Sequence, residues 1–372
     1  MKIDLPGSLT PHTMGEPRSY PPPSGPSTSR VAYAAAHVVA GGEFLDWETT
    51  LAFRRHLWSY GLGVAEAMDT AQRGMGLDWA ATRELIVRSG REALSAGGRI
   101  VCGAGTDQLP PEPASLDEIV AAYEEQLAVI ESVDAVPALM ASRHLAAAAR
   151  GPDDYAAVYG RLLPQVKRPA VLHWLGPMFD PALEGYWGSP DLDTAAEALL
   201  ALIGEHASRV DGVKISLLDA GREIAFRRRL PPGVRLYTGD DFNYPELIRG
   251  DAEGYSDALL GIFDPIAPAA AAALRALDGG DTASYEEIFA PTVPLARHLF
   301  ETPTYYYKTG VVFLAWLTGH QKHFRMVGGL EGARSVPHMV RLFQLADAAG
   351  LFPDPGLAAH RMRAWLTVQG AE

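Results

Sequence analysis

Eight short apolar runs, separated by amphipathic stretches, are the sequence feature that most constrains how this chain folds. Such runs are typical of strands buried on both faces, as in a parallel sheet covered by helices. Eight is also the number of strands that closes a (β/α)8 barrel, so we predict the α/β class and a TIM barrel. The expected strands are Val31–Val39, Leu62–Met68, Arg99–Cys102, Ala135–Met140, Ala170–Trp174, Val213–Leu218, Val234–Tyr237 and Ala258–Phe263.

An open, doubly wound parallel sheet is the alternative fold for the same pattern. That fold usually places a glycine-rich phosphate turn directly after its first strand. Here the first run continues through Ala34–Val39, which contains no glycine. The barrel is therefore the preferred prediction. Helices are expected between the strands, at 46–60, 119–130 and 193–206 and from Gly151 onward.

Composition divides the chain into three parts. Residues 1–30 contain seven prolines among Gly, Ser and Thr, which predicts a turn-rich N-terminal arm. Residues 31–278 form the predicted barrel, closed by a helix at 268–277. Residues 279–372 show only helical patterns and form a predicted C-terminal helical region. Its helices are expected at 284–300, 305–317, 332–349 and 357–368.

Charge and hydropathy limit the classes of partner. The chain has 372 residues, a formal net charge of −13 and no basic stripe, which weighs against nucleic acid and anionic membranes. No apolar run reaches the 18 or so residues that span a bilayer, and the N-terminus does not read as a secretory signal. Cys102 is the only cysteine, so disulfides and thiolate metal clusters are not expected. We predict a cytoplasmic protein that acts on a small molecule.

Lys214 is the most informative single residue. Only five of the 32 basic residues are lysines, and this one interrupts an apolar run. Lysine is seldom buried without a partner or a purpose. Burial lowers the pKa of a lysine, and the neutral amine that results can attack a carbonyl carbon and form a Schiff base. The simpler alternative is a strand-end lysine with its ammonium group in solvent.

Polar residues follow almost every predicted strand. In a TIM barrel the C-terminal ends of the strands meet at one face, where active sites form. Each residue alone has a simpler reading: Asp240 and Asp241 can cap the next helix, and Arg143 and His144 can belong to a solvated loop. Their expected convergence is what predicts a site. The strand-end residues are His37, Glu66, Asp69, Thr70, Thr106, Asp107, Ser142, Arg143, His144, His173, Trp174, Lys214, Ser216, Thr238, Asp240, Asp241 and Asp264.

Five segments resemble, in position and residue type, the motifs of one enzyme superfamily. They are Val210–Ser216, Tyr237–Asp241, Tyr255–Pro268, Pro303–Lys308 and Asp69–Arg73. The family is the dihydrodipicolinate synthase and N-acetylneuraminate lyase superfamily, of which this chain resembles an uncharacterised, divergent branch over Val31 to Leu351. The resemblance implies a TIM barrel, a Schiff base at Lys214, a structural role for Lys308 and association as a homodimer or homotetramer.

The departures from the family pattern concern proton transfer and carboxylate binding. Family members commonly carry a proton-relaying Tyr near the end of strand five, where this chain has His173. Imidazole can also shuttle protons near neutral pH. The family's strand-two turn holds the carboxylate of a 2-oxo acid, and of its Thr pair only Thr70 remains. A 2-oxo acid would then need Arg73 or Arg143 as a bidentate partner.

These observations together predict a lyase of the class I aldolase or dehydratase type on a sugar-derived oxo acid or related carbonyl compound. Lys214 would form the imine and His173 would move protons. No cofactor is required. The extra loop 176–189 would be a lid, an aromatic wall or an oligomer contact. The expected substrate-binding residues are Thr70, Asp69, Arg73, Arg143, His144, Ser216, Asp240, Asp241 and His37.

Two other functions stay open from the sequence. The first is a metal-dependent isomerase or hydrolase on a similar barrel, although no His-x-His or His-Glu-x-x-His spacing supports it. Its ligands would come from His37, Glu66, Asp69, His144, His173 and Asp240. The second is a non-catalytic barrel that binds a small molecule, because a fold alone does not establish a function.

Overall fold

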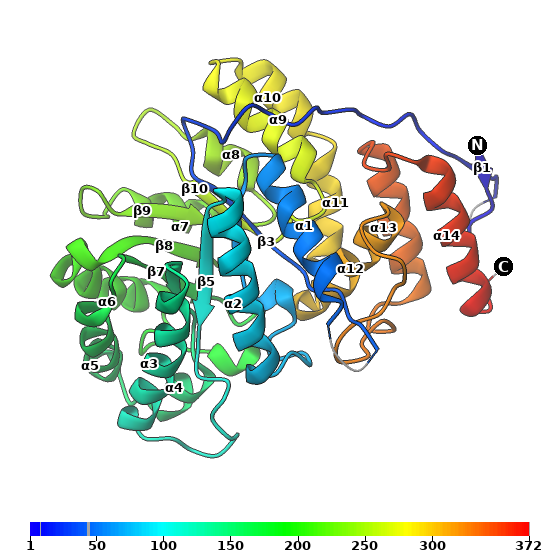
Figure 1. Ribbon diagram of the computed structural model, residues 1–372. Helices are drawn as coiled ribbons and strands as arrows, with labels where there is room; N and C mark the ends of the chain where they lie inside the picture. Colours follow the sequence, from blue (N-terminus) through cyan, green and yellow to red (C-terminus); the bar gives the residue numbers. More distant parts are fainter. Residues whose placement is uncertain (8, 43–44, 372) are drawn as a thin grey trace.

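Eight parallel strands close into a barrel in the computed structural model, which describes residues 1–7, 9–42 and 45–371. The strands follow chain order around the barrel, and the last pairs with the first (Figure 1). The predicted TIM barrel is therefore confirmed. The barrel strands are β3 (Ala32–Ala35), β4 (Gly63–Glu66), β5 (Ile100–Ala104), β6 (Val136–Leu139), β7 (Ala170–Leu175), β8 (Val210–Ser216), β9 (Arg235–Thr238) and β10 (Asp257–Leu260).

Each predicted apolar run overlaps one of these strands, although most strand ends differ from the prediction by one to three residues and the first strand is shorter than expected. The run Val31–Val39 is a strand only over Ala32–Ala35. From His37 the backbone leaves the ladder, because the His37 N–H donates to the Asp264 carboxylate at 2.8 Å instead of to a neighbouring strand.

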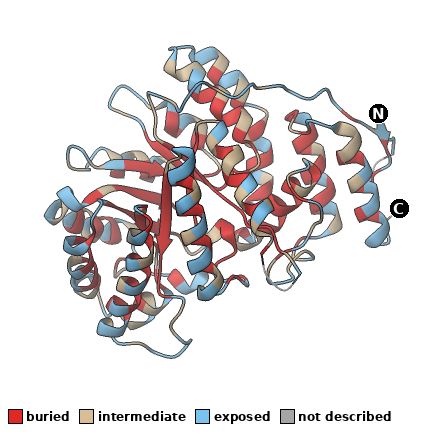
Figure 2. Cartoon of the chain, in the orientation of Figure 1, coloured by how far each residue is buried: buried red, intermediate tan, exposed pale blue. Residues whose placement is uncertain are grey.

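Helices cover the outside of the barrel, with buried faces toward the strands and exposed faces outward (Figures 1 and 2). A capping box begins the helix predicted at 119–130: the Ser115 N–H donates to Glu118 at 2.8 Å, and the Glu118 N–H donates to the Ser115 hydroxyl at 3.3 Å. Of the barrel helices, α2, α4 and α7 were not identified individually from the sequence. The helices are α1 (Trp47–Ser59), α2 (Trp79–Ala96), α3 (Leu116–Ser132), α4 (Arg143–Ala148), α5 (Pro152–Leu162), α6 (Leu192–Glu205), α7 (Ala220–Arg227), α8 (Tyr244–Arg249) and α9 (Ala267–Asp278).

The barrel interior is a packed core over most of its depth. A buried apolar cluster of residues from successive strands fills it, including Tyr33, Val101, Val171, Tyr237 and Leu259. Toward the C-terminal ends of the strands the inward positions are polar or small. This change of residue type leaves a small chamber at one end of an otherwise solid barrel.

Helices alone follow α9 in the part of the chain that the structure describes. The predicted helix at 284–300 was wrong in one respect, since it is two helices separated at Ala290 and Pro291. Proline lacks an N–H and its ring clashes with the preceding turn, so it interrupts the helix. None of the helices in the described ranges is long and apolar enough to cross a membrane. The C-terminal helices are α10 (Thr282–Phe289), α11 (Thr292–Leu299), α12 (Tyr307–Leu317), α13 (Val336–Ala348) and α14 (Pro355–Val368).

The N-terminal arm runs along the C-terminal helices and α9 (Figure 1). It contains a small antiparallel pair, β1 (Lys2–Ile3) and β2 (His12–Thr13). Two aspartates anchor it: Asp347 of α13 accepts from the His12 ring at 2.8 Å, and Asp278 accepts from the Ser29 N–H at 2.8 Å. The arm is therefore hydrogen-bonded to the helices of the same chain at both His12 and Ser29.

Candidate active site

Lys214 lies in β8 with its side chain inside the barrel. It is only 8% exposed, and among the residues that the structure describes its amine has no hydrogen-bond or ion-pair partner. It lines a small internal chamber whose other residues come from the C-terminal ends of six strands, a loop and α12. The chamber is lined by Ala35, Met68, Asp69, Thr70, Leu175, Phe179, Lys214, Ser216, Asp241, Gly261 and Tyr307.

A glycine makes the space that the Lys214 side chain occupies. A Cβ on Gly239, at the end of β9, would lie 2.2 Å from the Ser216 hydroxyl oxygen and 2.8 Å from Cε of Lys214. Real Cβ atoms do not approach other atoms so closely. The Gly in the segment Thr238–Asp241 is therefore required by the lysine beside it and by the serine two residues further along β8.

Burial and two carboxylates set the charge state of the lysine. Burial lowers the pKa of Lys214, and the carboxylates of Asp69 and Asp241 partly oppose this effect. Burial likewise raises the pKa of Asp241 to about 7, although the Ile262 N–H donates to it at 2.8 Å. The pKa values of the Lys214 amine and of the Asp241 carboxyl group are therefore both closer to neutral pH than those of exposed groups of the same kind.

His173 lies beside Lys214 on the neighbouring strand. The two residues are directly paired in the β7–β8 register, so both side chains point into the barrel. The Nε2 atom of His173 lies 3.2 Å from the Ser216 hydroxyl, and its buried Nδ1 has no partner among the described residues. Burial lowers the pKa of His173 well below its usual range, and the charge of Lys214 adds to this. The imidazole is therefore neutral at neutral pH.

Tyr307 is the site residue that our sequence analysis missed. It begins α12, yet its hydroxyl lies 2.9 Å from the Thr70 hydroxyl inside the chamber. The ring of Phe300 stacks on it with ring centroids 4.5 Å apart. The signal that could have found it is a run of three tyrosines at 305–307, which we interpreted only as part of a structural segment.

The adjacent residues Asp240 and Asp241 have different surroundings. Asp241 lines the chamber, whereas Asp240 accepts hydrogen bonds from the backbone N–H groups of Phe242 and Asn243 at 2.9 and 3.0 Å. Asp240 therefore closes the turn that precedes α8, but it does not cap that helix, whose N-cap residue is Asn243. Its predicted contact with substrate stays a prediction and has no support from its position.

The two arginines considered for a substrate carboxylate also differ. Arg73 is buried, forms an ion pair with Asp107 and donates to the carbonyl groups of Ala67 and Gly103 at 3.0 and 2.7 Å. The N–H groups of the Arg73 guanidinium therefore already have hydrogen-bond partners within the protein. Arg143, by contrast, is about half exposed and is held through its Nε by Asp180 at 2.5 Å.

His144 and His37 both have partners that fix their rings away from the lysine. His144 lies 3.1 Å from the Thr106 hydroxyl through Nδ1 and 2.9 Å from the Pro110 carbonyl through Nε2, so both ring nitrogens are used. His37 pairs with Asp264 at 2.8 Å and is fully buried. Neither histidine lines the chamber, and their predicted substrate contacts stay predictions.

The six residues considered as metal ligands are not brought together by the fold. Glu66 is buried in a two-point ion pair with Arg54, and His37 and Asp240 are engaged as described above. In the described ranges, the group of His, Cys, Asp or Glu side chains spaced for a metal is His298, Glu301 and His338, in the C-terminal helical region. The barrel site therefore offers no set of clustered ligands within those ranges.

Lys308 is a second buried lysine close to the site. Its ammonium group lies 4.1 Å from the ring centroid of Tyr305 and 5.4 Å from that of Tyr307. Burial lowers the pKa of Lys308 to about 8, while Asp69 opposes this effect. The aromatic faces favour the charged form. Lys308 lines neither the chamber nor the cleft described next.

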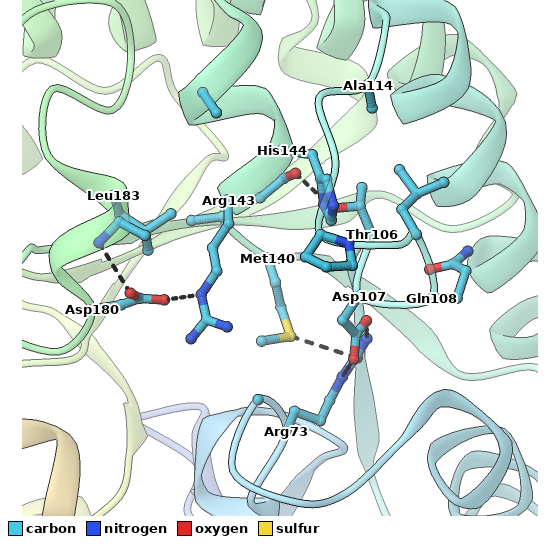
Figure 3. Close-up of a pocket in the computed structure, with 18 of the residues that line it drawn as sticks. Arg73, Thr106, Asp107, Gln108, Ala114, Met140, Arg143, His144, Asp180 and Leu183 are labelled. Atoms are coloured by element: carbon cyan, nitrogen blue, oxygen red, sulfur yellow. Dashed lines mark hydrogen bonds and ion pairs between the residues drawn. The ribbon is translucent and has the colours of Figure 1, made fainter.

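A large cleft of about 1050 Å³ opens beside the chamber, over the C-terminal ends of β4, β5 and β6 (Figure 3). Asp69 and Leu175 line both spaces, so the two are neighbours. Arg73, Arg143 and His144 belong to the cleft. Of the predicted site residues, Lys214, Ser216, Thr70 and Asp241 line the inner chamber, and Asp69 lines both spaces. His173, His37 and Asp240 line neither space.

The loop 176–189 contributes to both spaces, but only partly as expected. Phe179 lines the inner chamber. Tyr186 and Trp187 are buried against α5, with the Tyr186 hydroxyl 2.9 Å from that of Tyr159. These two aromatic rings are therefore part of the core and line neither space, which does not support the aromatic wall, one of the three alternatives for this loop.

Solved structures with the same fold are found at low sequence identity. Dihydrodipicolinate synthase from Aquifex aeolicus is 14% identical, with a TM-score of 0.67 over 87% of this chain and 99% of that chain. YagE, a prophage protein of E. coli K12 belonging to the dihydrodipicolinic acid synthase family and solved with pyruvate, is 14% identical, with a TM-score of 0.67 over 87% and 100%. The enzyme from Cyanidioschyzon merolae with lysine bound is 18% identical, with a TM-score of 0.64 over 87% and 98%.

The predicted resemblance to this superfamily is thus confirmed at the level of the fold. No curated protein matches the chain. A family model described as "Protein of unknown function (DUF993)" matches residues 3–371, nearly the whole length. That extent agrees with a divergent branch that keeps the barrel and the C-terminal helices together. The chain belongs to this family, DUF993.

Proposed function

We propose that the chain is a Schiff-base-forming lyase in which Lys214 is the nucleophile. The observation that carries the proposal is the environment of its amine. The amine is buried, has no partner among the described residues, has a lowered pKa and lines a chamber at the catalytic face of the barrel. Among the neighbours in fold, YagE was solved in complex with pyruvate, and a bound 2-oxo acid in that protein fits a carbonyl substrate here.

The reaction begins when the neutral amine attacks the carbonyl carbon. The C–N bond forms as the carbonyl π bond breaks, and the oxygen takes a proton to give a carbinolamine. Loss of that oxygen as water leaves an iminium ion. The iminium then accepts the electron pair released when a carbon–carbon bond breaks, or when a proton leaves the neighbouring carbon before dehydration.

Two hydrogen-bonded pairs are placed to move the protons. One is Tyr307 with Thr70, 2.9 Å apart, and the other is His173 with Ser216, 3.2 Å apart. Because His173 is neutral, it can accept a proton from a hydroxyl and return it without carrying a lasting charge. Burial lowers the pKa of Lys214 and so favours the neutral amine, while the Asp69 and Asp241 carboxylates partly oppose this effect.

The proposal is tested by trapping the imine with sodium cyanoborohydride in the presence of pyruvate, followed by intact mass and peptide mapping. We expect one adduct on Lys214 that is absent from Lys214→Ala. The exposed lysine variant Lys322→Ala is the matched control and should form the adduct at the wild-type rate. An adduct mapped to Lys308 instead, or none with any 2-oxo acid, would contradict the assignment.

The finer parts of the sequence prediction stay predictions. These are the sugar-derived substrate, the choice between cleavage and dehydration, the cytoplasmic location and a homodimer or homotetramer. The division into an arm, a barrel and a C-terminal helical region is likewise a proposal. Tyr307 favours treating 31–278 and 279–372 as one functional unit, because it brings a residue of the second part into the chamber of the first.

A further inference from the structure

The inner chamber is too small to hold a whole substrate. Its free volume is about 10 Å³, which is room for about one water molecule. A carbonyl group that reaches Lys214 therefore fills it. The remainder of the substrate has to lie in the adjoining cleft of about 1050 Å³, which meets the chamber at Asp69 and Leu175. The cleft is as large as the sites that enclose drug-sized ligands.

The walls of the cleft are largely apolar. Its exposed surface is contributed mainly by carbon atoms of side chains such as Leu77, Trp79, Leu109, Met140 and Leu183. Figure 3 shows Met140 and Leu183 on either side of Arg143. A polyhydroxylated sugar would leave its hydroxyl groups without partners against such walls, which is costly.

The polar side chains of the cleft are mostly engaged by each other. Arg73 pairs with Asp107, and His144 is held at both ring nitrogens. Arg143 is less fully engaged: its Nε pairs with the Asp180 carboxylate, and the Tyr305 phenol is a neutral neighbour of its guanidinium. Its two terminal amino groups point into the open space in Figure 3 and lie 3.2 Å from where a Cβ on Gly74 would be. They are placed to hold a carboxylate.

We propose that the substrates are 2-oxo acids that carry a bulky apolar group, such as an aromatic ring, on the chain beyond the carbonyl. The carbonyl enters the chamber, the carboxylate pairs with Arg143, and the apolar group lies against the walls of the cleft. This inference rests on the proposed function for the carbonyl, but the binding of the apolar group depends on the cleft alone.

The first test measures binding by titration calorimetry with three probes. Pyruvate has no apolar group, phenylpyruvate has both parts, and 3-phenylpropionate has the ring and carboxylate but cannot form an imine. We expect phenylpyruvate to bind roughly tenfold or more tightly than pyruvate, because a buried ring contributes favourable transfer free energy. We also expect 3-phenylpropionate to bind more tightly than pyruvate. Equal or reversed affinities would overturn the proposal.

The second test fills the cleft. Ala147 of α4 lines the cleft and is exposed there, so Ala147→Trp should occupy the space without disturbing the core. We expect it to weaken 3-phenylpropionate binding by roughly tenfold or more. The matched control is Ala157→Trp, at an exposed position of α5 outside the cleft, which should bind the probe as wild type does. Unchanged binding by Ala147→Trp would overturn the proposal.

The two proposals fail in distinguishable ways. If 3-phenylpropionate binds and Ala147→Trp weakens it, but no 2-oxo acid is trapped, the apolar cleft stands and the imine mechanism falls. If pyruvate is trapped on Lys214 but neither aromatic probe binds better than pyruvate, the lyase stands and the apolar substrate class falls. The wild-type comparison of probes keeps the test valid even if the tryptophan variant does not fold.

Discussion

The hydroxyl groups of Thr70 and Tyr307 lie 2.9 Å apart inside the barrel, although the residues are 237 positions apart in the sequence. Thr70 lies in the short helix after β4, and Tyr307 begins α12 of the C-terminal helices. Because one oxygen donates to the other, the pair can pass a proton between the chamber and the phenol. The C-terminal helices therefore complete the site and do more than cover the barrel.

Replacing Tyr307 by Phe removes the hydroxyl and keeps the ring that stacks on Phe300. General acid–base catalysis by a positioned group commonly contributes about 100-fold or more, so we expect imine formation to slow by about that factor. Loss of the hydrogen bond to Thr70 should cost about 1 kcal/mol of stability. Timed cyanoborohydride trapping with pyruvate measures the rate, and thermal unfolding measures the stability.

The neighbouring Tyr306→Phe variant is the control, because Tyr306 lines neither the chamber nor the cleft. It should react at the wild-type rate. Equal rates for Tyr307→Phe and Tyr306→Phe would show that the phenol has no part in proton transfer.

Replacing Gly239 by Ala should block the lysine and leave the barrel folded. The new methyl group would overlap the Ser216 hydroxyl and Cε of Lys214, so one of them must move. We expect a loss of at least roughly tenfold in trapping rate and a stability cost of about 1–3 kcal/mol from overpacking. Urea unfolding followed by fluorescence measures the second quantity.

Gly279→Ala provides the comparison at a position without crowding. The nearest atom to a Cβ there is 3.5 Å away, and the residue has helical φ and ψ angles. Its stability should stay within about 1 kcal/mol of wild type, and trapping should be unchanged. A Gly239→Ala enzyme that reacts normally would mean that Lys214 takes up another position when it reacts.

Replacing Asp241 by Asn should shift the pH dependence of imine formation to lower pH. The Asp241 carboxylate raises the pKa of Lys214 against the stronger lowering effect of burial. Without this negative charge the pKa of Lys214 falls, so the neutral amine is present at lower pH. We expect the midpoint of the trapping rate against pH to move down by roughly one unit.

Asp211→Asn is the matched control, because Asp211 lies at the opposite end of the same strand and pairs with Arg235. Its profile should coincide with that of the wild type. A midpoint for Asp241→Asn that stays in place or moves upward would rule out the electrostatic role of this carboxyl group.

Replacing Arg54 by Met should destabilise the barrel, because it leaves the fully buried Glu66 carboxylate without its partner. Arg54 donates to both oxygens of Glu66 at 2.8 Å. Removing one member of a buried ion pair typically costs about 3–5 kcal/mol. The double variant Arg54→Met/Glu66→Leu should recover much of this loss, since no buried charge then remains.

An exposed pair on α2 gives the reference for this measurement. Arg88 and Glu84 are half-exposed and 2.6 Å apart, so Arg88→Met should cost less than about 1 kcal/mol. The urea unfolding midpoints of Arg54→Met, the double variant and Arg88→Met measure these differences in stability. If the double variant is no more stable than Arg54→Met, the cost comes from lost packing and the uncompensated charge is not its cause.

Patterns short enough to lie within one βα unit were sufficient to predict the fold. Each of the eight apolar runs overlaps a barrel strand, because strands buried on both faces of a parallel sheet need continuous apolar residues. The position of Lys214 on the sixth barrel strand followed from the same local reasoning. The sequence did not predict where the strand within Val31–Val39 ends, or that the helix at 284–300 is divided at Pro291. Strand and helix ends depend on tertiary contacts such as that of His37 with Asp264.

What the sequence by itself determined was the barrel and the presence of a lysine within it. The tertiary structure alone decided which polar residues join that lysine. Asp240 and Asp241 are chemically identical neighbours, yet one caps a turn and the other lines the chamber. Tyr307 reaches Thr70 only because the C-terminal helices fold back over the barrel. Such contacts join residues far apart in the chain, and no local pattern of residue types records where a side chain points once the helices have packed.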